Sequence, residues 1–348
     1  MLSKTAPVSN SDVQTSGGQS STKELIDRAV FSAKHRKMVL PIQRKAGVWI
    51  GFLLFGTAAL FANTARATEA LPKCCVWRVT NAKAPFYLVG SVHALGRDDY
   101  PLPSPYELAS KEAKRLLFEF NPNRAAEFKK KLAAAGKYPP GQDIRSRIDP
   151  RLLAWLRENV SPLKVDQNRL KKSRPRVGNF DSGLGYKPWW IAQHLVDTRN
   201  SSHMSTSHGL DDYLVARARK MGQEIDGLES VDEHVAVLGG LPDCDSEFLL
   251  RDALNHSKDG AVEFTRMRSA WRKGDTAALW AGDAHLRKEA PQIAARLIDQ
   301  RNSKWISRIE AELKTGKPTA IVAGALHFSG PNSVITLLQK RGYKIEQL

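Results

Sequence analysis

The sequence predicts an α/β fold with a central sheet, and two short motifs near opposite ends of the chain carry this prediction. Gly90-Ser91-Val92-His93 and Gly324-Ala325-Leu326-His327 are both G-x-x-H, and each follows an apolar run with strand character. Each precedes a Gly, a Pro, a segment with helical period and a second apolar strand. We therefore expect the sheet to be built from two GxxH αβ repeats, separated by a large helical insert at about residues 123–315.

The first repeat is predicted in detail by residues 76–121. The alternating pattern at 76–80 and the apolar run at 86–89 are joined by a turn that contains Pro85, which is typical of a β-hairpin. A helix follows the prolines after His93 and runs to about residue 114, and residues 116–120 form the next strand. The second repeat has the corresponding strands at 319–323 and 343–345.

The insert is dominated by helical periodicity, which Pro and Gly residues interrupt. A short strand is expected within it at residues 224–229. The expected helices are 124–135, 150–159, 188–198, 209–221, 246–256, 259–273, 275–284 and 290–315.

The first 67 residues have the character of a targeting region. Residues 1–37 are polar and are expected to be disordered or to be a misannotated extension, with Met38 as the true start. In residues 38–67 a basic flank, an apolar run at 48–62 and the small-x-small pattern Ala65-Arg66-Ala67 indicate a signal peptide. Domain 68–348 is then periplasmic or secreted. The alternative is an uncleaved run 48–62 that anchors the protein in the inner membrane.

Charge and cysteine content exclude some functions and leave one question open. The net charge is +17, but the Lys and Arg residues are scattered and do not alternate with aromatic residues as in single-strand binders. We therefore expect no nucleic-acid partner. The sequence has no CxxC motif, which argues against a thiolate zinc site. Cys74 or Cys75 either pairs with Cys244 in an oxidising compartment or remains a packed free thiol.

The candidate site residues follow from the two repeats. His93 and His327 come just after strands, where open α/β sheets place ligands, and Glu119 lies at the end of the strand that completes the first repeat. Two imidazoles and a carboxylate can hold a catalytic divalent metal that activates water. Alternatively, His93 is a metal-free general base. Arg301 either stabilises an oxyanion or lies on an exposed charged helix face.

The chain resembles the TraB/GumN family, to which the Tiki proteins belong, over about residues 76–348. The resemblance implies a fold related to erythromycin esterase and ChaN-like proteins. The segments that carry it are Gly90-Ser91-Val92-His93, Leu117-Phe118-Glu119, Lys187-Pro188-Trp189, Gly209-Leu210-Asp211, Gly227-Leu228-Glu229-Ser230, Trp271 with Gly274-Asp275, Arg301-Asn302 with Trp305, and 323–330 running into Lys340-Arg341-Gly342-Tyr343.

The resemblance also implies chemistry, because the Tiki branch consists of metal-dependent proteases. Its proposed ligands fall by motif on His93, Glu119 and His327, with Arg301 as a polar partner. The expected cofactor is a divalent ion (Mn, Co or Zn), and the expected partner is a peptide or polypeptide substrate. The sequence departs from the family where Asn121 replaces the usual acidic residue after Glu119.

Three functions are compatible with the sequence, and the first is the one that we predict. The first is an exported metal-dependent hydrolase, a peptidase, with the metal-activated water at the paired histidines. The second is a non-catalytic protein of the cell envelope that binds a peptide or a saccharide. The third is a membrane-tethered assembly factor, which requires that the segment 48–62 remain uncleaved and contact the membrane.

Overall fold

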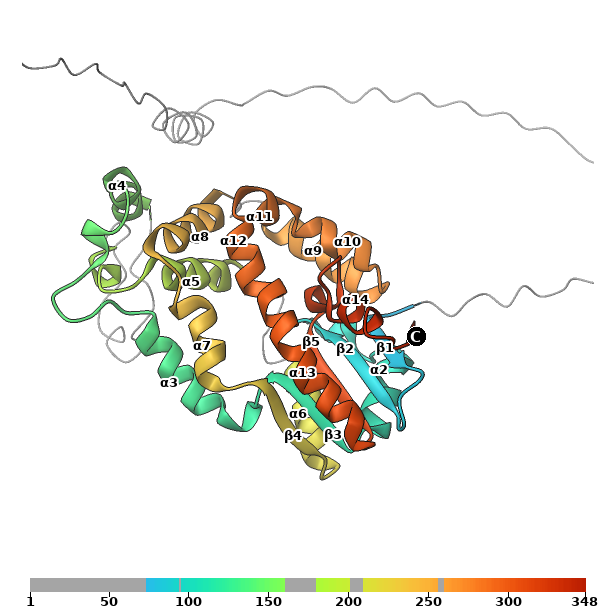
Figure 1. The fold of residues 1–348 in the computed structure, drawn as a ribbon. Coiled ribbons are helices and arrows are strands. Elements are labelled where there is room, and N and C mark those ends of the chain that lie inside the picture. Colours follow the sequence, from blue (N-terminus) through green and yellow to red (C-terminus); the bar gives the residue numbers. More distant parts are fainter. Residues whose placement is uncertain (1–72, 94, 160–179, 201–208, 256–259) are drawn as a thin grey trace, which may run out of the picture. The chain divides into compact units, whose positions relative to one another are not determined.

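The computed structural model describes residues 73–93, 95–159, 180–200, 209–255 and 260–348 (Figure 1). The predictions for residues 1–37 and 38–67, including the apolar run 48–62, lie outside the described residues. Within the described ranges, the helices are too short or too polar to cross a bilayer.

The described chain contains a six-stranded sheet in the order β4-β3-β5-β2-β1-β6. The central strand β5 lies between β2 and β3 and is parallel to both, and β4 pairs in parallel with β3. Strand β1 is antiparallel to its neighbours β2 and β6. The strands are β1 (Val76–Val79), β2 (Phe86–Ser91), β3 (Arg115–Phe120), β4 (Glu224–Glu229), β5 (Thr319–Gly324) and β6 (Ile345–Gln347).

This sheet and the surrounding helices confirm the predicted α/β class. The hairpin β1–β2 and the strand β4 inside the helical insert are also confirmed. The last strand, β6, begins at Ile345, the residue at which the predicted strand 343–345 ends. Backbone bonds from β1 set this position, because Val79 pairs with Ile345.

The predicted helices are present, and the structure adds two that were not predicted, α7 and α11. The long predicted helix 290–315 is divided by a π-helical turn, η7. The α-helices are α2 (Ser104–Glu112), α3 (Ala125–Ala135), α4 (Pro150–Asn159), α5 (Pro188–Asn200), α6 (Leu210–Lys220), α7 (Val231–Gly239), α8 (Asp243–Asn255), α9 (Gly260–Arg272), α10 (Thr276–Gly282), α11 (Ala284–Glu289), α12 (Pro291–Ala294), α13 (Gln300–Thr315) and α14 (Val334–Gln339), and the other short helical turns used below are η1 (Arg97–Asp99), η7 (Ala295–Asp299) and η8 (Ala325–Phe328).

Helices cover both faces of the sheet. Figure 1 shows α13 lying across one face, with α2 and α6 behind the strands. Ile306 and Ile309 of α13 join the main hydrophobic core, as do Tyr106 of α2 and Leu214 of α6. A smaller second core packs α4, α5 and α8 together. Because α13 lies directly on the sheet, its residues can reach the ends of the parallel strands.

The three cysteines are free thiols in the structure, so the disulfide alternative is not the arrangement found. Cys74 and Cys75 are buried in the main core, whereas Cys244 is exposed on α8. Burial raises the pKa of both Cys74 and Cys75 to about 12. These two residues therefore act as small apolar core side chains and not as nucleophiles.

A buried carboxylate, Asp99, ties the loop after His93 to helix α9. Its oxygens accept hydrogen bonds from Nε of Arg268 at 2.8 Å and from Nη1 of Arg272 at 2.6 Å. The Gly96 N–H donates a third bond at 2.8 Å. Burial acts to raise the pKa of Asp99, but these hydrogen bonds outweigh it and lower the pKa below its ordinary value. The ion pairs thereby fix η1 against α9.

We expect Asp99→Asn to lower the free energy of unfolding by about 2 kcal/mol at neutral pH, the typical value for hydrogen bonds to a charged group. The folded pKa is depressed, so this contribution is present above the unfolded pKa of about 3.9 and is lost as the pH falls through the folded value. Urea unfolding across pH measures it, with the exposed Asp98→Asn as the control. Equal effects of the two substitutions would contradict the prediction.

Candidate functional site

The carboxyl ends of three parallel strands bring two carboxylates and a histidine to one edge of the sheet. Glu119 is the next-to-last residue of β3, and Glu229 is the last residue of β4. Strand β5 ends at Gly324 and continues into η8, which carries His327. Because parallel strands end at the same edge, residues that are distant in sequence meet here.

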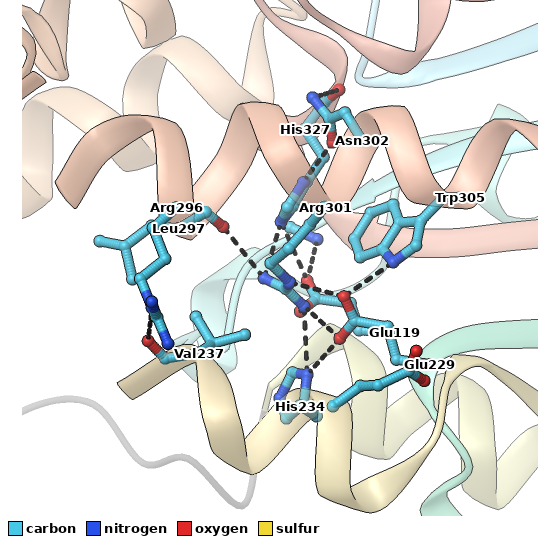
Figure 2. A network of polar contacts seen from close by, with 12 residues as sticks. Glu119, Glu229, His234, Val237, Arg296, Leu297, Arg301, Asn302, Trp305 and His327 are labelled. Carbon is cyan, nitrogen blue, oxygen red and sulfur yellow. Dashed lines mark hydrogen bonds and ion pairs between the residues drawn. The ribbon is translucent and has the colours of Figure 1, made fainter. Parts of the chain in front are cut away.

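Arg301 of α13 lies at the centre of this group (Figure 2). Its Nη2 donates to Oε2 of Glu119 at 2.6 Å, and its Nε donates to Oε1 of Glu229 at 2.8 Å. A second bond from Nη2 reaches the other oxygen of Glu229 at 3.0 Å. The remaining nitrogen, Nη1, lies 3.2 Å from Nε2 of His327. The residue is only 9% exposed, so these pairs are shielded from solvent.

The π-helical turn η7 helps to place this guanidinium. In η7 the N–H of Gln300 bonds to the carbonyl of Ala295, five residues back, so the turn is wider than an α-helical one. The Leu297 carbonyl in the same turn accepts a bond from Nη1 of Arg301 at 3.2 Å. The irregular turn therefore supplies a backbone acceptor that directs the arginine side chain towards the strand ends.

His327 is held as a neutral imidazole with a fixed orientation. It is 3% exposed, and burial lowers its pKa to about 4. Its Nδ1 lies 2.6 Å from Oδ1 of Asn302, and its ring packs on Trp305 with the centroids 4.4 Å apart. The Asn302 amide must present oxygen to this nitrogen, so Nδ1 carries the proton and Nε2 is left as an acceptor.

Glu119 remains ionised in this buried setting. Burial acts to raise its pKa, but the neighbouring side chains of His327 and Arg301 outweigh burial and hold the pKa well below its ordinary value. Its Oε1 accepts the Gly324 N–H at 2.9 Å and lies 3.7 Å from Nε2 of His327. The site thus combines an ionised carboxylate, a neutral imidazole and a guanidinium.

Glu229 and His234 complete the network on the side of α7. Oε1 of Glu229 accepts the indole N–H of Trp305 at 2.8 Å, and Oε2 lies 2.8 Å from Nδ1 of His234. Burial acts to raise the pKa of Glu229, but the hydrogen bonds from His234 and Arg301 lower it overall. The His234 ring is packed against Phe120, with the centroids 4.9 Å apart. These contacts hold Arg301 from the side opposite His327.

His93, the fourth predicted site residue, lies outside this hydrogen-bonded cluster. Its side chain is 75% exposed, and its Nδ1 lies 3.2 Å from Oδ2 of Asp211 in the first turn of α6. This partner raises the pKa of His93. The charges of Glu119 and Arg301 also influence that pKa, which places His93 within electrostatic range of the cluster. Glu119, Arg301 and His327 are therefore in mutual contact, whereas His93 faces a different carboxylate.

The predicted metal ligands fit an ion only in part. Metal–ligand bonds of about 2.0–2.2 Å allow two ligand atoms on one ion to be at most about 4.4 Å apart. The 3.7 Å between Oε1 of Glu119 and Nε2 of His327 meets this limit, and Asn302 orients the imidazole as partners of metal-bound histidines do. However, the described residues contain no group of three or more His, Cys, Asp or Glu side chains arranged to hold a metal. The third ligand is not in place.

A cavity of about 180 Å³ reaches Arg301 and Glu229 from between α7 and α13. Charged side chains of both signs surround it, including Glu233 and Lys304. Its lining is Leu228, Glu229, Glu233, Ala236, Val237, Arg296, Gln300, Arg301, Lys304 and Trp305. The cavity is large enough for several water molecules or one side chain, so it gives small groups access to the polar network.

Sequence reasoning did not assign Glu229, His234, Asn302 or Asp211 to the site. Glu229 had a usable signal, because it ends a predicted strand as Glu119 nearly does, and it pairs in register with Phe120. Asn302 follows Arg301 directly, but helical periodicity alone did not show that both would be buried. His234 was missed because the helix that holds it, α7, was not predicted.

Comparison with known proteins agrees with the sequence resemblance. A profile of the TraB/PrgY/gumN family matches residues 75–347. The uncharacterized protein YbaP of Escherichia coli K12 is 26% identical over 257 residues, which cover 73% of this chain and 88% of YbaP. YbaP of Shigella flexneri is 25% identical over 256 residues, covering 73% and 87%. No solved structure matches the chain significantly. The family match spans nearly all of the described residues, and the chain therefore belongs to the TraB/PrgY/gumN family.

Proposed function

We propose that this protein is an exported hydrolase that cleaves peptides at the strand-end cluster of Glu119, Arg301 and His327. The observation that carries the proposal is a neutral imidazole with an oriented Nε2 beside an ionised carboxylate and a guanidinium. Titratable side chains whose pKa values are strongly shifted by burial and by charged neighbours are typical of catalytic sites, and the pKa values of both His327 and Glu119 are lowered here. The position at the carboxyl edge of parallel strands is where α/β proteins bind ligands.

In this proposal the carboxylate of Glu119 and Nε2 of His327 orient the attacking water, and Nε2 accepts its proton as the water oxygen bonds to the substrate carbonyl carbon. The same proton passes to the leaving amine as the C–N bond breaks. Arg301 places positive charge next to Glu119 and His327, where the oxyanion of the tetrahedral intermediate would develop. Its 3.2 Å contact with Nε2 is longer than its contacts with the two glutamates. We propose that water and the substrate carbonyl replace this longer contact between Arg301 and His327 when substrate binds. The ion pairs of Arg301 with Glu119 and Glu229 continue to hold the guanidinium.

A divalent ion (Mn, Co or Zn) is part of the proposal, with His93, Glu119 and His327 as its ligands. Such an ion would supply water of lowered pKa. Glu119 and His327 support this assignment by their distance, whereas His93 would have to turn away from Asp211 to complete it.

The metal content of the mature protein, starting near Thr68, tests this part directly. We expect about one divalent ion per chain, lost in His93→Ala and in His327→Ala while circular dichroism stays unchanged. Peptide-library cleavage is followed by mass spectrometry in the same samples. Full metal occupancy in the double variant would reject the metal site. Cleavage that survives complete chelation would reject metal dependence but retain the hydrolase.

Non-catalytic binding of a peptide or saccharide is the second candidate, and one observation favours it. The guanidinium of Arg301 already has partners for Nε, Nη1 and Nη2, so the network is satisfied without substrate. A binding protein would retain its ligand chemically unchanged. Mass spectrometry of candidate peptides and oligosaccharides after long incubation distinguishes the two, because only the hydrolase produces fragments.

We also propose that the sheet derives from two GxxH repeats, with a fold like that of erythromycin esterase and ChaN-like proteins. The units would be β2-α2-β3 and β5-α14-β6, each with its GxxH at the end of the first strand. Their first strands pair in parallel, with Ser91 opposite Gly324.

The proposed export of the protein is tested by N-terminal sequencing of exported protein. A start near Thr68 supports a location in the periplasm or the medium, and an intact 48–62 segment supports the inner-membrane anchor.

A further inference from the structure

Asn302 is completely buried and bridges three groups at the strand-end cluster. Its Nδ2 donates to the backbone carbonyl of Asn332 at 2.9 Å and to that of His327 at 3.3 Å. Its Oδ1 faces Nδ1 of His327 at 2.6 Å. Sequence reasoning gave this residue no role, and the pairing of Glu119 with Arg301 does not involve it.

The two carbonyl contacts fix the orientation of the Asn302 amide. A carbonyl oxygen can only accept hydrogen bonds, so the NH₂ end of the amide must face Asn332 and His327. The amide oxygen then faces Nδ1 of the imidazole, which must be the donor. The proton of the neutral ring is therefore on Nδ1, and the lone pair of Nε2 is available to Nη1 of Arg301 at 3.2 Å, with the Glu119 carboxylate 3.7 Å away.

We propose that Asn302 is a positioning residue that fixes the tautomer of His327, so that Nε2 is the atom available to the site. Without the amide oxygen, an Nδ1 proton would be buried without an acceptor, which disfavours this tautomer. The nearby Glu119 carboxylate would then draw the proton to Nε2. The tautomer is inferred from the hydrogen bonds of Asn302 alone, and only its consequence for hydrolysis rests on the proposed function.

Side-chain ¹⁵N NMR of His327 tests the proposal without any assay of activity. In the native protein we expect a protonated Nδ1 and an unprotonated Nε2. Asn302→Leu removes all three contacts, and a population protonated on Nε2 should appear. Asn302→Asp retains an acceptor for Nδ1 but loses both donors, so Nδ1 should keep its proton. Ser303→Ala is the control, because the exposed Ser303 hydroxyl donates to the Asp299 carbonyl and not to the cluster.

The pair of variants separates positioning from a purely structural role. Both variants lose the same bonds to the two carbonyls, so a purely structural role predicts the same change in both spectra. An Nδ1 that stays fully protonated in Asn302→Leu, or loses its proton in Asn302→Asp, would overturn the proposal. Where hydrolysis is measurable, Asn302→Leu should reduce kcat by about 10–100-fold. No hydrolysis in the native protein would reject the proposed function and leave the tautomer result standing.

Discussion

Replacement of Arg301 by methionine is expected to lower the free energy of unfolding by about 3–5 kcal/mol at neutral pH, as is typical when one partner of a buried ion pair is removed. Arg301 is the shared cation of Glu119 and Glu229, and both carboxylates remain buried without it. Urea unfolding followed by tryptophan fluorescence measures the change. Arg308→Met is the control on the same helix, because Arg308 is more exposed and its partners Asp226 and Glu312 both retain Arg115 as a second cation. We expect less than about 1 kcal/mol there.

The pH dependence of this effect has a definite sign. In the native protein the pKa values of Glu119 and Glu229 are lowered. Their contribution to the free energy of unfolding is therefore present above the unfolded pKa of about 4.3, and it is lost as the pH falls through the pKa values of the folded protein. In the variant the uncompensated carboxylates gain stability on protonation. The difference in the free energy of unfolding between the native protein and Arg301→Met should therefore become smaller at acidic pH. A difference that stays constant from neutral to acidic pH would contradict the buried ion-pair explanation.

Loss of the His327 imidazole is expected to reduce peptide hydrolysis by about 10²–10⁴-fold, the usual contribution of a positioned proton acceptor. His327→Ala removes the neutral imidazole, whose Nε2 faces the donor Nη1 of Arg301 and lies 3.7 Å from the carboxylate of Glu119. The assay is kcat/KM on a peptide that the native protein cleaves.

His285→Ala provides a matched histidine substitution on the exposed helix α11. Its hydrolysis should equal that of the native protein. Near-ultraviolet circular dichroism of both variants checks the packing around Trp305, which contacts His327 in the native fold. Native-like spectra with undiminished hydrolysis in His327→Ala would remove the imidazole from the proposed mechanism.

The parts of the fold that were predictable are those with strong local patterns. The alternating and apolar runs of β1, β2 and β5 identify strands before any contact is known. Helix α7 was missed although Ser230 and Glu233 form a capping box at its start, a signal that the sequence contains. The π-helical turn had no such signal, because its bonds depend on how α12 and α13 pack on the rest of the chain.

The site was predictable to the extent that it lies at strand ends. Glu119 and His327 were identified because each follows an apolar strand, and parallel strands bring such positions together. The burial of Arg301 and Asn302 was not predictable, since a charged residue on an amphipathic helix normally faces water. The pairing of His93 with Asp211 depends on the start of α6 lying against the chain just after β2, where the Leu210 N–H donates to the Val92 carbonyl, and sequence periodicity does not specify this contact.

The order of the strands has a consequence for synthesis of the chain. Strands β2 and β3 are separated in the sheet by β5, which begins at Thr319, 199 residues after β3 ends at Phe120. At about 5–20 residues per second, a ribosome takes roughly 10–40 s to make the intervening stretch. During this time two apolar strands have emerged without the partner that joins them. A nascent chain therefore cannot join β2 to β3 until β5 has been synthesised, and chaperones have access to these strands until then.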